Sequence, residues 1–409
     1  MTKNVERKPA ASPEKKKNIF PSCKIMNTTG ENPTIIIGAG PAGLATAGRL
    51  REAGEDFIVL EKSQQVGYMW HCHYDRLCLH TVKQLSHLPG LEFPEAYPTY
   101  VTRAQLCDYF TEYARHFNIK PIFGIDITSI QPASLHKWSV TDSKGQNWRS
   151  NNVVICTGLN RVPNVPNWNN QDSFMGTIEH SRTYKNADKY RMKKVLVVGM
   201  GNTGAEIALD LAEQKVDVSI SVRSAVNIIP RDINGRPTQL TGKQLEKLPF
   251  GLGDWLGNQI RRLVVGDLSK YGLETKKMSP LQQLKETGMT PVIDLGTVKE
   301  IKKGTIKILP EIKTFADDAI SFSDGTSHAF DAVILATGYH ANLADFIADI
   351  EPIMDRYQLP NTASPGGHLG GLHFVGFDNY KLGGLLGTIF TDSLTVCNSI
   401  SDGPVITRT

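Results

Sequence analysis

Two glycine-rich segments have the spacing of phosphate-binding loops. The first, GAGPAG, begins at Gly38, and the second, GMGNTG, begins at Gly199. Each follows a short apolar run and precedes a helical pattern, which is the context that such a loop requires. Glycine lets the backbone approach a pyrophosphate closely, and the free N–H groups of the following helix stabilise its charge. Two such loops predict two bound dinucleotides. The residues expected to hold them are Gly38, Ala39, Gly40, Pro41, Ala42, Gly43, Gly199, Met200, Gly201, Asn202, Thr203 and Gly204.

The residue at the end of the next strand distinguishes the two ligands. After the first loop, an apolar run ends in Glu61, whose carboxylate can accept hydrogen bonds from a ribose diol, as in FAD or NAD. After the second loop, the corresponding run ends in Arg223, whose planar guanidinium suits a ribose 2′-phosphate. We therefore expect NADPH at the second loop. Solvated charges at ordinary strand ends are the plain alternative.

The charge of the chain is concentrated in its first residues. The chain has 409 residues, enough for two domains, and its 40% hydrophobic and 21% charged residues are ordinary for a globular protein. Residues 1–30 carry seven Lys or Arg against two Glu, a balance of +5 that leaves −1 for the rest of the net +4. We expect a disordered basic tail at residues 1–32 and no nucleic-acid partner.

Membrane, metal and disulfide chemistry have no signal in the sequence. No run approaches the roughly 18 apolar residues of a spanning helix, and no secretory signal is evident. The six cysteines are scattered without a CxxC pair or metal spacing, which fits reduced thiols in a cytoplasmic protein without a metal site. The sequence leaves a homodimer open.

The order of the predicted elements indicates one domain inserted in another. The fold class we expect is α/β, with two Rossmann-like dinucleotide-binding domains. Two apolar strands end in Thr-Gly, at Gly158 and at Gly338, and resemble exits from a central sheet. We expect the second nucleotide domain at residues 167–325, inserted in the first at residues 33–166 and 326–409. Within the insert, the apolar spacing from Trp255 to Val265 predicts a helix that faces the core, with membrane contact as the alternative.

A further motif lies between the two loops. The segment FMGTIEHSRTY, from Phe174 to Tyr184, matches FxGxxxHxxxY. This pattern, together with GAGPAG, EKSQQVGYMW, GMGNTG and ATGY in the same order, resembles the class B flavin-containing monooxygenases over nearly all of residues 33–400. The resemblance implies FAD at the first loop and a flavin C4a-(hydro)peroxide, formed with NADPH and O2, that oxidises a small-molecule substrate. The protein itself then needs no catalytic triad.

The resemblance also implies further cofactor contacts and a brace between the domains. Gly176, His180 and Tyr184 are expected to brace the join between the domains near NADPH. The residues expected by family position to contact the cofactors are Lys62, Trp70, His80, Thr81 and Gly338.

A narrower resemblance concerns the substrate. LHTVKQLSHLPG, GDLSKYGLE and SDGTSHAFDAVILATGYHAN are similar to segments of the YUCCA branch, plant auxin-forming enzymes that oxidatively decarboxylate indole-3-pyruvate to indole-3-acetate. The match is partial. YUCCA enzymes tend to have LHLPKQ where this chain has LHTVKQ, and Val82 stands where the amine-oxidising branch usually has Asn. Lys83 is either a partner for a substrate carboxylate or a plain surface residue.

Several other activities remain open. Oxygenation at nitrogen, at sulfur or on an indole ring is the alternative within the family, and Baeyer-Villiger oxidation of ketones is a third. A disulfide or quinone reductase and a redox-sensing binder share the two-loop architecture but not the monooxygenase motif.

Overall fold

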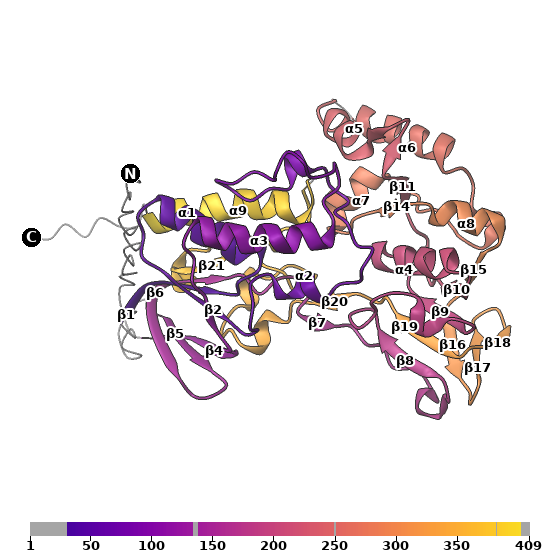
Figure 1. Cartoon of the computed structure of the whole chain (residues 1–409), viewed down its shortest axis with the longest axis horizontal. Helices are drawn as coiled ribbons and strands as arrows, with labels where there is room; N and C mark the ends of the chain where they lie inside the picture. Colours follow the sequence, from indigo (N-terminus) through magenta and orange to yellow (C-terminus); the bar gives the residue numbers. More distant parts are fainter. Residues whose placement is uncertain (1–30, 134–137, 249–250, 382, 402–409) are drawn as a thin grey trace, which may run out of the picture.

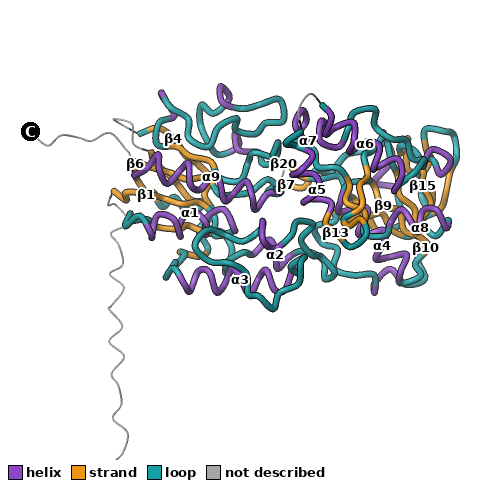
Figure 2. Tube along the Cα trace, turned by 90° about the horizontal axis from the view of Figure 1, so that it is seen from above, coloured by secondary structure: helices purple, strands orange, loops and turns teal. Residues whose placement is uncertain are grey.

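The computed structural model describes residues 31–133, 138–248, 251–381 and 383–401. Two sheets stand side by side along the long axis of the molecule, each covered by helices (Figures 1 and 2). The expected tail at residues 1–32 lies outside the described part except for its last two residues, which instead begin the first strand.

The first sheet surrounds the first glycine loop. Its described strands run in the order β3-β2-β1-β6-β5-β4, with β21 also paired to β6. Ile35 and Ile37 of β1 face one core cluster and Ile36 faces another, so both faces of this sheet are buried and the run reads as continuously apolar. The strands are β1 (Glu31–Ile37), β2 (Ile58–Glu61), β3 (Ile122–Phe123), β4 (Ile127–Pro132), β5 (Trp138–Asp142), β6 (Asn147–Ile155) and β21 (Leu372–Phe374).

Helices from both ends of the chain cover one face of this sheet. α1 begins directly at the glycine loop with Pro41, and α9 from the C-terminal part packs beside it (Figure 1). α3 begins with a capping box, in which Thr102 and Gln105 each satisfy a backbone N–H of the other. The helices are α1 (Pro41–Glu52), α2 (Tyr68–Cys72), α3 (Arg103–His116) and α9 (Gly384–Ser401).

The second sheet surrounds the second loop. Its described strands are all parallel and run in the order β15-β10-β9-β19-β8, with α4 and α8 on one face and the meander β16-β17-β18 on the other. These elements are β8 (Thr177–His180), β9 (Lys194–Val198), α4 (Asn202–Glu213), β10 (Asp217–Ser221), α8 (Thr297–Lys303), β15 (Ile306–Leu309), β16 (Ile312–Phe315), β17 (Ala319–Phe322), β18 (Ser327–Ala329) and β19 (Ala332–Leu335). The α/β class with two glycine loops is thus confirmed.

One strand differs from the expected division of the chain. β19 pairs with β9 and β8, so the chain stays in the second sheet ten residues beyond the expected boundary at residue 325. A buried apolar strand that ends in Thr-Gly has the same sequence pattern in either sheet. The sequence therefore could not show which sheet β19 joins. The chain crosses between the sheets through a short antiparallel pair, β7 (Val162–Pro163) and β20 (Tyr339–His340).

A helical segment between β10 and α8 stands over the junction of the two sheets (Figure 1). Its helix α6 is amphipathic as expected, but two residues differ from the expected exposure: Arg261 is 7% exposed, whereas Leu263 is 85% exposed. Periodicity located the helix but did not show which side is covered. The elements are β11 (Ile228–Pro230), β12 (Asp232–Ile233), β13 (Arg236–Pro237), α5 (Thr238–Leu245), α6 (Leu252–Val264), α7 (Pro280–Thr287) and β14 (Val292–Asp294). Within the described residues, none of the helices has the length and hydropathy of a membrane-crossing segment.

Candidate active site

The three glycines of the first loop have different surroundings. Gly38 has a φ of +106°, and a Cβ there would lie 2.6 Å from the carbonyl oxygen of Cys156. A Cβ at Gly43 would lie 1.9 Å from the carbonyl oxygen of Gly38, so this glycine allows α1 to pack against the turn. Gly40 has no atom within 4 Å of its Cβ position. Only the middle glycine faces open space, where a pyrophosphate would lie.

The second loop repeats this arrangement. Gly199 has a φ of +105°, a Cβ at Gly204 would lie 2.0 Å from the carbonyl oxygen of Gly199, and Gly201 faces open space. The N-cap residues of α1 and α4 are Gly40 and Gly201, and neither helix has a side-chain cap. The first N–H groups of both helices are therefore available to an anion. Both loops fit the pyrophosphate of a dinucleotide.

The residues at the strand ends lie beside their loops. Glu61 accepts hydrogen bonds from the backbone N–H groups of Ala39 at 2.6 Å and Ser63 at 2.7 Å, which holds its carboxylate at the edge of the first loop. Arg223 follows the end of β10 and is exposed, with no described residue bonded to its side chain. Both positions suit the ribose contacts expected of them.

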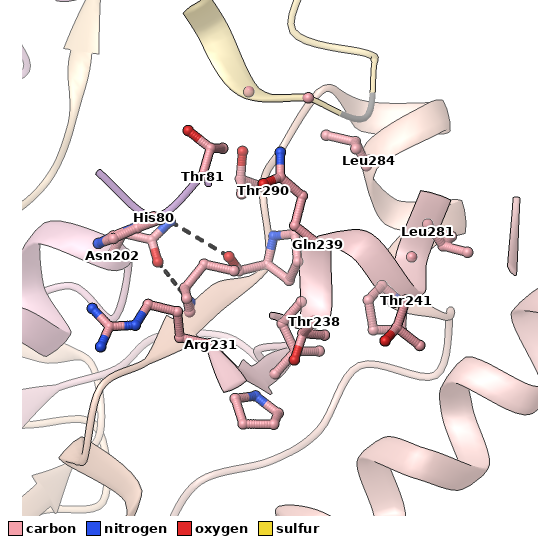
Figure 3. A pocket seen from close by; sticks show the side chains of 18 of the residues that line it. His80, Thr81, Asn202, Arg231, Thr238, Gln239, Thr241, Leu281, Leu284 and Thr290 are labelled. Carbon is pink, nitrogen blue, oxygen red and sulfur yellow. Dashed lines mark hydrogen bonds between the residues drawn. The ribbon is translucent and has the colours of Figure 1, made fainter. Parts of the chain in front are cut away.

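A cavity of about 390 Å³ lies where the two units meet (Figure 3). It brings together four of the predicted residues, Trp70, His80 and Thr81 from the first unit and Asn202 from the second. Its remaining wall is mostly apolar and comes from β11, the segment α5 to α7, β14 and the start of α9. A volume of this size matches ligand pockets in proteins.

His80 links the two units inside the cavity wall. Its imidazole Nε2 is hydrogen-bonded to the carboxylate of Glu206 on α4, which is 1% exposed. Burial, followed by the nearby Glu206 carboxylate, raises the pKa of Tyr74 well above its usual value. Glu206 was not predicted from the sequence, although a carboxylate among the buried positions of α4 is a signal that sequence reasoning can use.

The other predicted residues have separate surroundings. Both polar atoms of the Asn202 amide are hydrogen-bonded to the backbone at β14. Its Oδ1 accepts from the Ile293 N–H within β14 at 2.6 Å, and its Nδ2 donates to the carbonyl of Pro291 just before β14. Lys62 forms an exposed ion pair with Asp126 at 2.9 Å, away from the cavity.

Gly338 also lies outside the cavity lining. Its φ is +87°, and its carbonyl oxygen accepts from the Asn164 N–H at 2.9 Å. It therefore belongs to the crossing between the two sheets.

The FxGxxxHxxxY residues lie in and next to the second sheet. A Cβ at Gly176 would lie 2.5 Å from the ring of Phe174. His180 is hydrogen-bonded through Nε2 to the carbonyl oxygen of Gly338 at 3.1 Å, at the crossing to the first sheet. Burial lowers the pKa of His180. Tyr184 is fully buried and donates to Asp210 of α4 at 2.5 Å. These contacts hold the motif residues in place within the fold.

The cavity wall supplied by α5 contains residues that the sequence did not indicate. Thr238 and Gln239 begin α5 and line the cavity, and the side-chain Oε1 of Gln239 accepts from the backbone N–H of Val82 at 2.8 Å. Lys83 instead donates to the carbonyl oxygens of Glu95 and Tyr97 and does not line the cavity.

Comparisons with known proteins agree with this architecture. Among curated relatives, the chain is 37% identical over 361 residues to indole-3-pyruvate monooxygenase YUCCA6 of Arabidopsis thaliana, covering 86% of each chain. It is 35% identical over 379 residues to indole-3-pyruvate monooxygenase YUCCA4 of Oryza sativa subsp. japonica, covering 88% of this chain and 86% of that one.

Solved structures share the fold at low identity. A flavin-containing monooxygenase from Stenotrophomonas maltophilia has a TM-score of 0.68 at 18% identity, covering 90% of this chain and 98% of that one. OTEMO in complex with FAD and NADP has a TM-score of 0.67 at 14% identity, covering 91% and 85%. The family model described as "Flavin-binding monooxygenase-like" matches residues 32–355. On this match and these identities, the chain belongs to the flavin-binding monooxygenase-like family.

Proposed function

We propose that this flavin-dependent monooxygenase uses FAD and NADPH to convert indole-3-pyruvate and O2 to indole-3-acetate, CO2 and water. The observation that carries the proposal is the cavity shared by both units, which has an apolar wall and His80, Thr81 and Asn202 at one end. The curated relatives named above carry that activity in their names and match most of the chain.

The residues of the chain would bind, orient and shield the cofactors. The first loop would hold the FAD pyrophosphate, with Glu61 on its ribose, and the second loop would hold NADPH, with Arg223 on the 2′-phosphate. When bound, FAD supplies the oxygen-activating chemistry.

The cavity wall would complete the site. Trp70 and Thr81 would line the flavin, and the hydrogen bond between His80 and Glu206 would keep the two units in register at the cavity. The apolar residues of α5 to α7 would exclude water from the substrate. Lys62 and Gly338 stay predictions for the cofactor periphery, because neither lines the cavity.

Product analysis of the purified holoprotein tests the proposal. NADPH and O2 consumption are followed with and without indole-3-pyruvate, while indole-3-acetate and hydrogen peroxide are quantified. Formation of indole-3-acetate at near one-to-one coupling to NADPH supports the proposal. NADPH oxidation that yields only hydrogen peroxide with this substrate, but an oxygenated product with an amine, a sulfide or indole, would establish the alternative within the family.

Two properties remain predictions from the sequence alone. They are a cytoplasmic location and a homodimer. Light scattering on the eluted holoprotein measures the mass in solution and so tests the dimer.

A further inference from the structure

Two neighbouring polar side chains of the cavity wall have a buried atom without a partner. Thr238 and Gln239 occupy the first two positions of α5. Within the described part of the chain, Oγ1 of Thr238 and Nε2 of Gln239 are buried and make no hydrogen bond. Because leaving a buried donor unpaired costs stability, such groups are rare and call for an explanation. Both residues line the cavity, so the most direct explanation is a bound ligand that makes these hydrogen bonds.

The direction of the Gln239 amide is fixed by the first unit. Its Oε1 accepts from the backbone N–H of Val82 at 2.8 Å, a contact between residues 157 positions apart. Since the carboxamide is planar, this bond leaves Nε2 as the free side of the group. Figure 3 shows the side chain reaching toward the end of the cavity that carries Thr81 and Thr290. This is the end expected to line the flavin.

One cation of the cavity wall has no carboxylate partner among the described residues. Three cations line the cavity, Arg231, Arg261 and Lys381, against one carboxylate, Asp254. Arg231 is paired with a carboxylate at 3.1 Å and Lys381 with another at 2.7 Å. Arg261 is 7% exposed, and no described carboxylate lies within salt-bridge distance of its guanidinium; its Nε donates to the amide oxygen of Asn258. The unpaired Arg261 guanidinium therefore makes the part of the wall around it favourable to a negatively charged group.

We propose that Gln239 binds the carboxylate of an aryl 2-oxo acid and so determines the substrate class of this cavity. This inference rests on the proposed function. In a 2-oxo acid the carboxylate is bonded directly to the carbon that reacts, so it must lie at the flavin end, where Val82 holds Gln239. Carboxylate oxygens only accept hydrogen bonds, and the Nε2 of Gln239 is a free donor there. The Thr238 side chain points away from this end (Figure 3).

The arrangement also predicts discrimination against neutral analogues. A buried donor that is satisfied only by the right ligand is left unpaired by a ligand that lacks the acceptor, which makes such a site selective. Indole-3-propionate and indole-3-propanol share the ring and have the chain length of indole-3-pyruvate, but differ in the charged group. Their relative affinities therefore report on the carboxylate contact without any turnover.

Three substitutions in the holoprotein test the proposal. Gln239→Glu keeps an oxygen for the Val82 N–H but removes the NH2 donor and adds a negative charge. Thr238→Val removes, at nearly constant volume, a cavity-wall hydroxyl that points away from the flavin end, and is a control within the cavity (Figure 3). Gln244→Glu is the matched control, because Gln244 lies on the same helix with its side chain exposed and bonded to Arg236. FAD content and circular dichroism verify that each variant is folded.

Affinity is measured by equilibrium dialysis of the two indole ligands. At pH 8 we expect Gln239→Glu to weaken indole-3-propionate binding by about 30-fold or more. Its effect on indole-3-propanol should stay within about twofold. The effects of Thr238→Val and Gln244→Glu on either ligand should also stay within about twofold. In Gln239→Glu, propionate binding should recover as the pH is lowered and the new carboxyl is protonated.

The outcomes separate this inference from the proposed function. If Gln239→Glu changes the affinities of acid and alcohol equally, or changes neither, the inference is wrong. If wild type fails to decarboxylate indole-3-pyruvate but Gln239→Glu loses the preference for the carboxylate, the site stands and the proposed reaction fails.

Discussion

The imidazole of His80 is hydrogen-bonded to the carboxylate of Glu206, and this contact joins the two nucleotide-binding units at the cavity. His80 comes from the loop before α3, and Glu206 comes from the helix that follows the second glycine loop, 126 positions later. The second oxygen of Glu206 is buried without a partner among the described residues. A carboxylate this deeply buried is stable only when hydrogen-bonded, so His80 stabilises Glu206 and is oriented by it.

Replacing Glu206 should therefore destabilise the protein. We expect Glu206→Ala to lower the free energy of unfolding by about 2 to 4 kcal/mol, because it leaves a cavity and removes the acceptor of His80. Glu206→Gln should cost less, since its amide oxygen still accepts from His80. Urea denaturation measures both. Glu213→Ala on the same helix is the control: its side chain is 51% exposed and pairs with Arg76, so about 1 kcal/mol or less is expected. Equal losses at Glu206 and Glu213 would contradict this role.

Because Gly40 faces open space, a substitution there should affect FAD binding more than the stability of the apoprotein. Its φ of −78° suits any residue, and no atom lies near its Cβ position. Gly40→Ala should change the stability of the apoprotein by less than about 1 kcal/mol but weaken FAD binding by about tenfold or more. Gly43→Ala should destabilise the apoprotein itself by about 2 kcal/mol or more, because the new Cβ would overlap the carbonyl oxygen of Gly38. Differential scanning fluorimetry and flavin titration give the two readouts, and a stable, FAD-depleted Gly43→Ala protein would refute the assignment.

Much of the loop geometry could be read from the sequence because it is local. The positive φ at Gly38, the open position at Gly40 and the close packing of Gly43 on Gly38 lie within one strand, turn and helix. The close approach of Gly38 to Cys156 is not local and was not predicted. Glu206 and Gln239 could not be found in this way. Their contacts join residues 126 and 157 positions apart, and no short pattern encodes such pairs.

The burial of Arg261 could not be read from the sequence either. Periodicity locates α6 but does not say that the cavity covers the side with Arg261 rather than the side with Leu263.

A buried histidine should make the stability depend on pH. Burial lowers the pKa of His373 to about 4, whereas an unfolded histidine has a pKa of about 6.5. Between these values the unfolded chain binds a proton that the native protein does not, so stability falls as the pH is lowered through this window. The loss reaches roughly 3 kcal/mol below pH 4.

Removing this histidine should flatten the dependence. His373→Asn should lose less stability between pH 6.5 and about pH 4 than wild type, measured by urea denaturation at constant excess of FAD. The exposed His116→Asn is the control and should follow wild type. An unchanged slope in His373→Asn would show that other groups dominate the acid sensitivity.

The position of Arg223 predicts the coenzyme preference. The residue follows β10 beside the second loop, is exposed, and is bonded to none of the described residues, so its guanidinium is available to a 2′-phosphate. We expect Arg223→Ser to raise the KM for NADPH and leave that for NADH unchanged, so that the preference falls by about 10-fold to 100-fold. Binding of 2′,5′-ADP against 5′-ADP gives the same comparison without turnover. Arg191→Ser is the matched control, because Arg191 lies on the surface of the same unit and is already paired with Asp188 at 2.8 Å. If Arg223→Ser keeps the full preference for the 2′-phosphate, another cation near the second loop must supply it, and the strand-end interpretation fails.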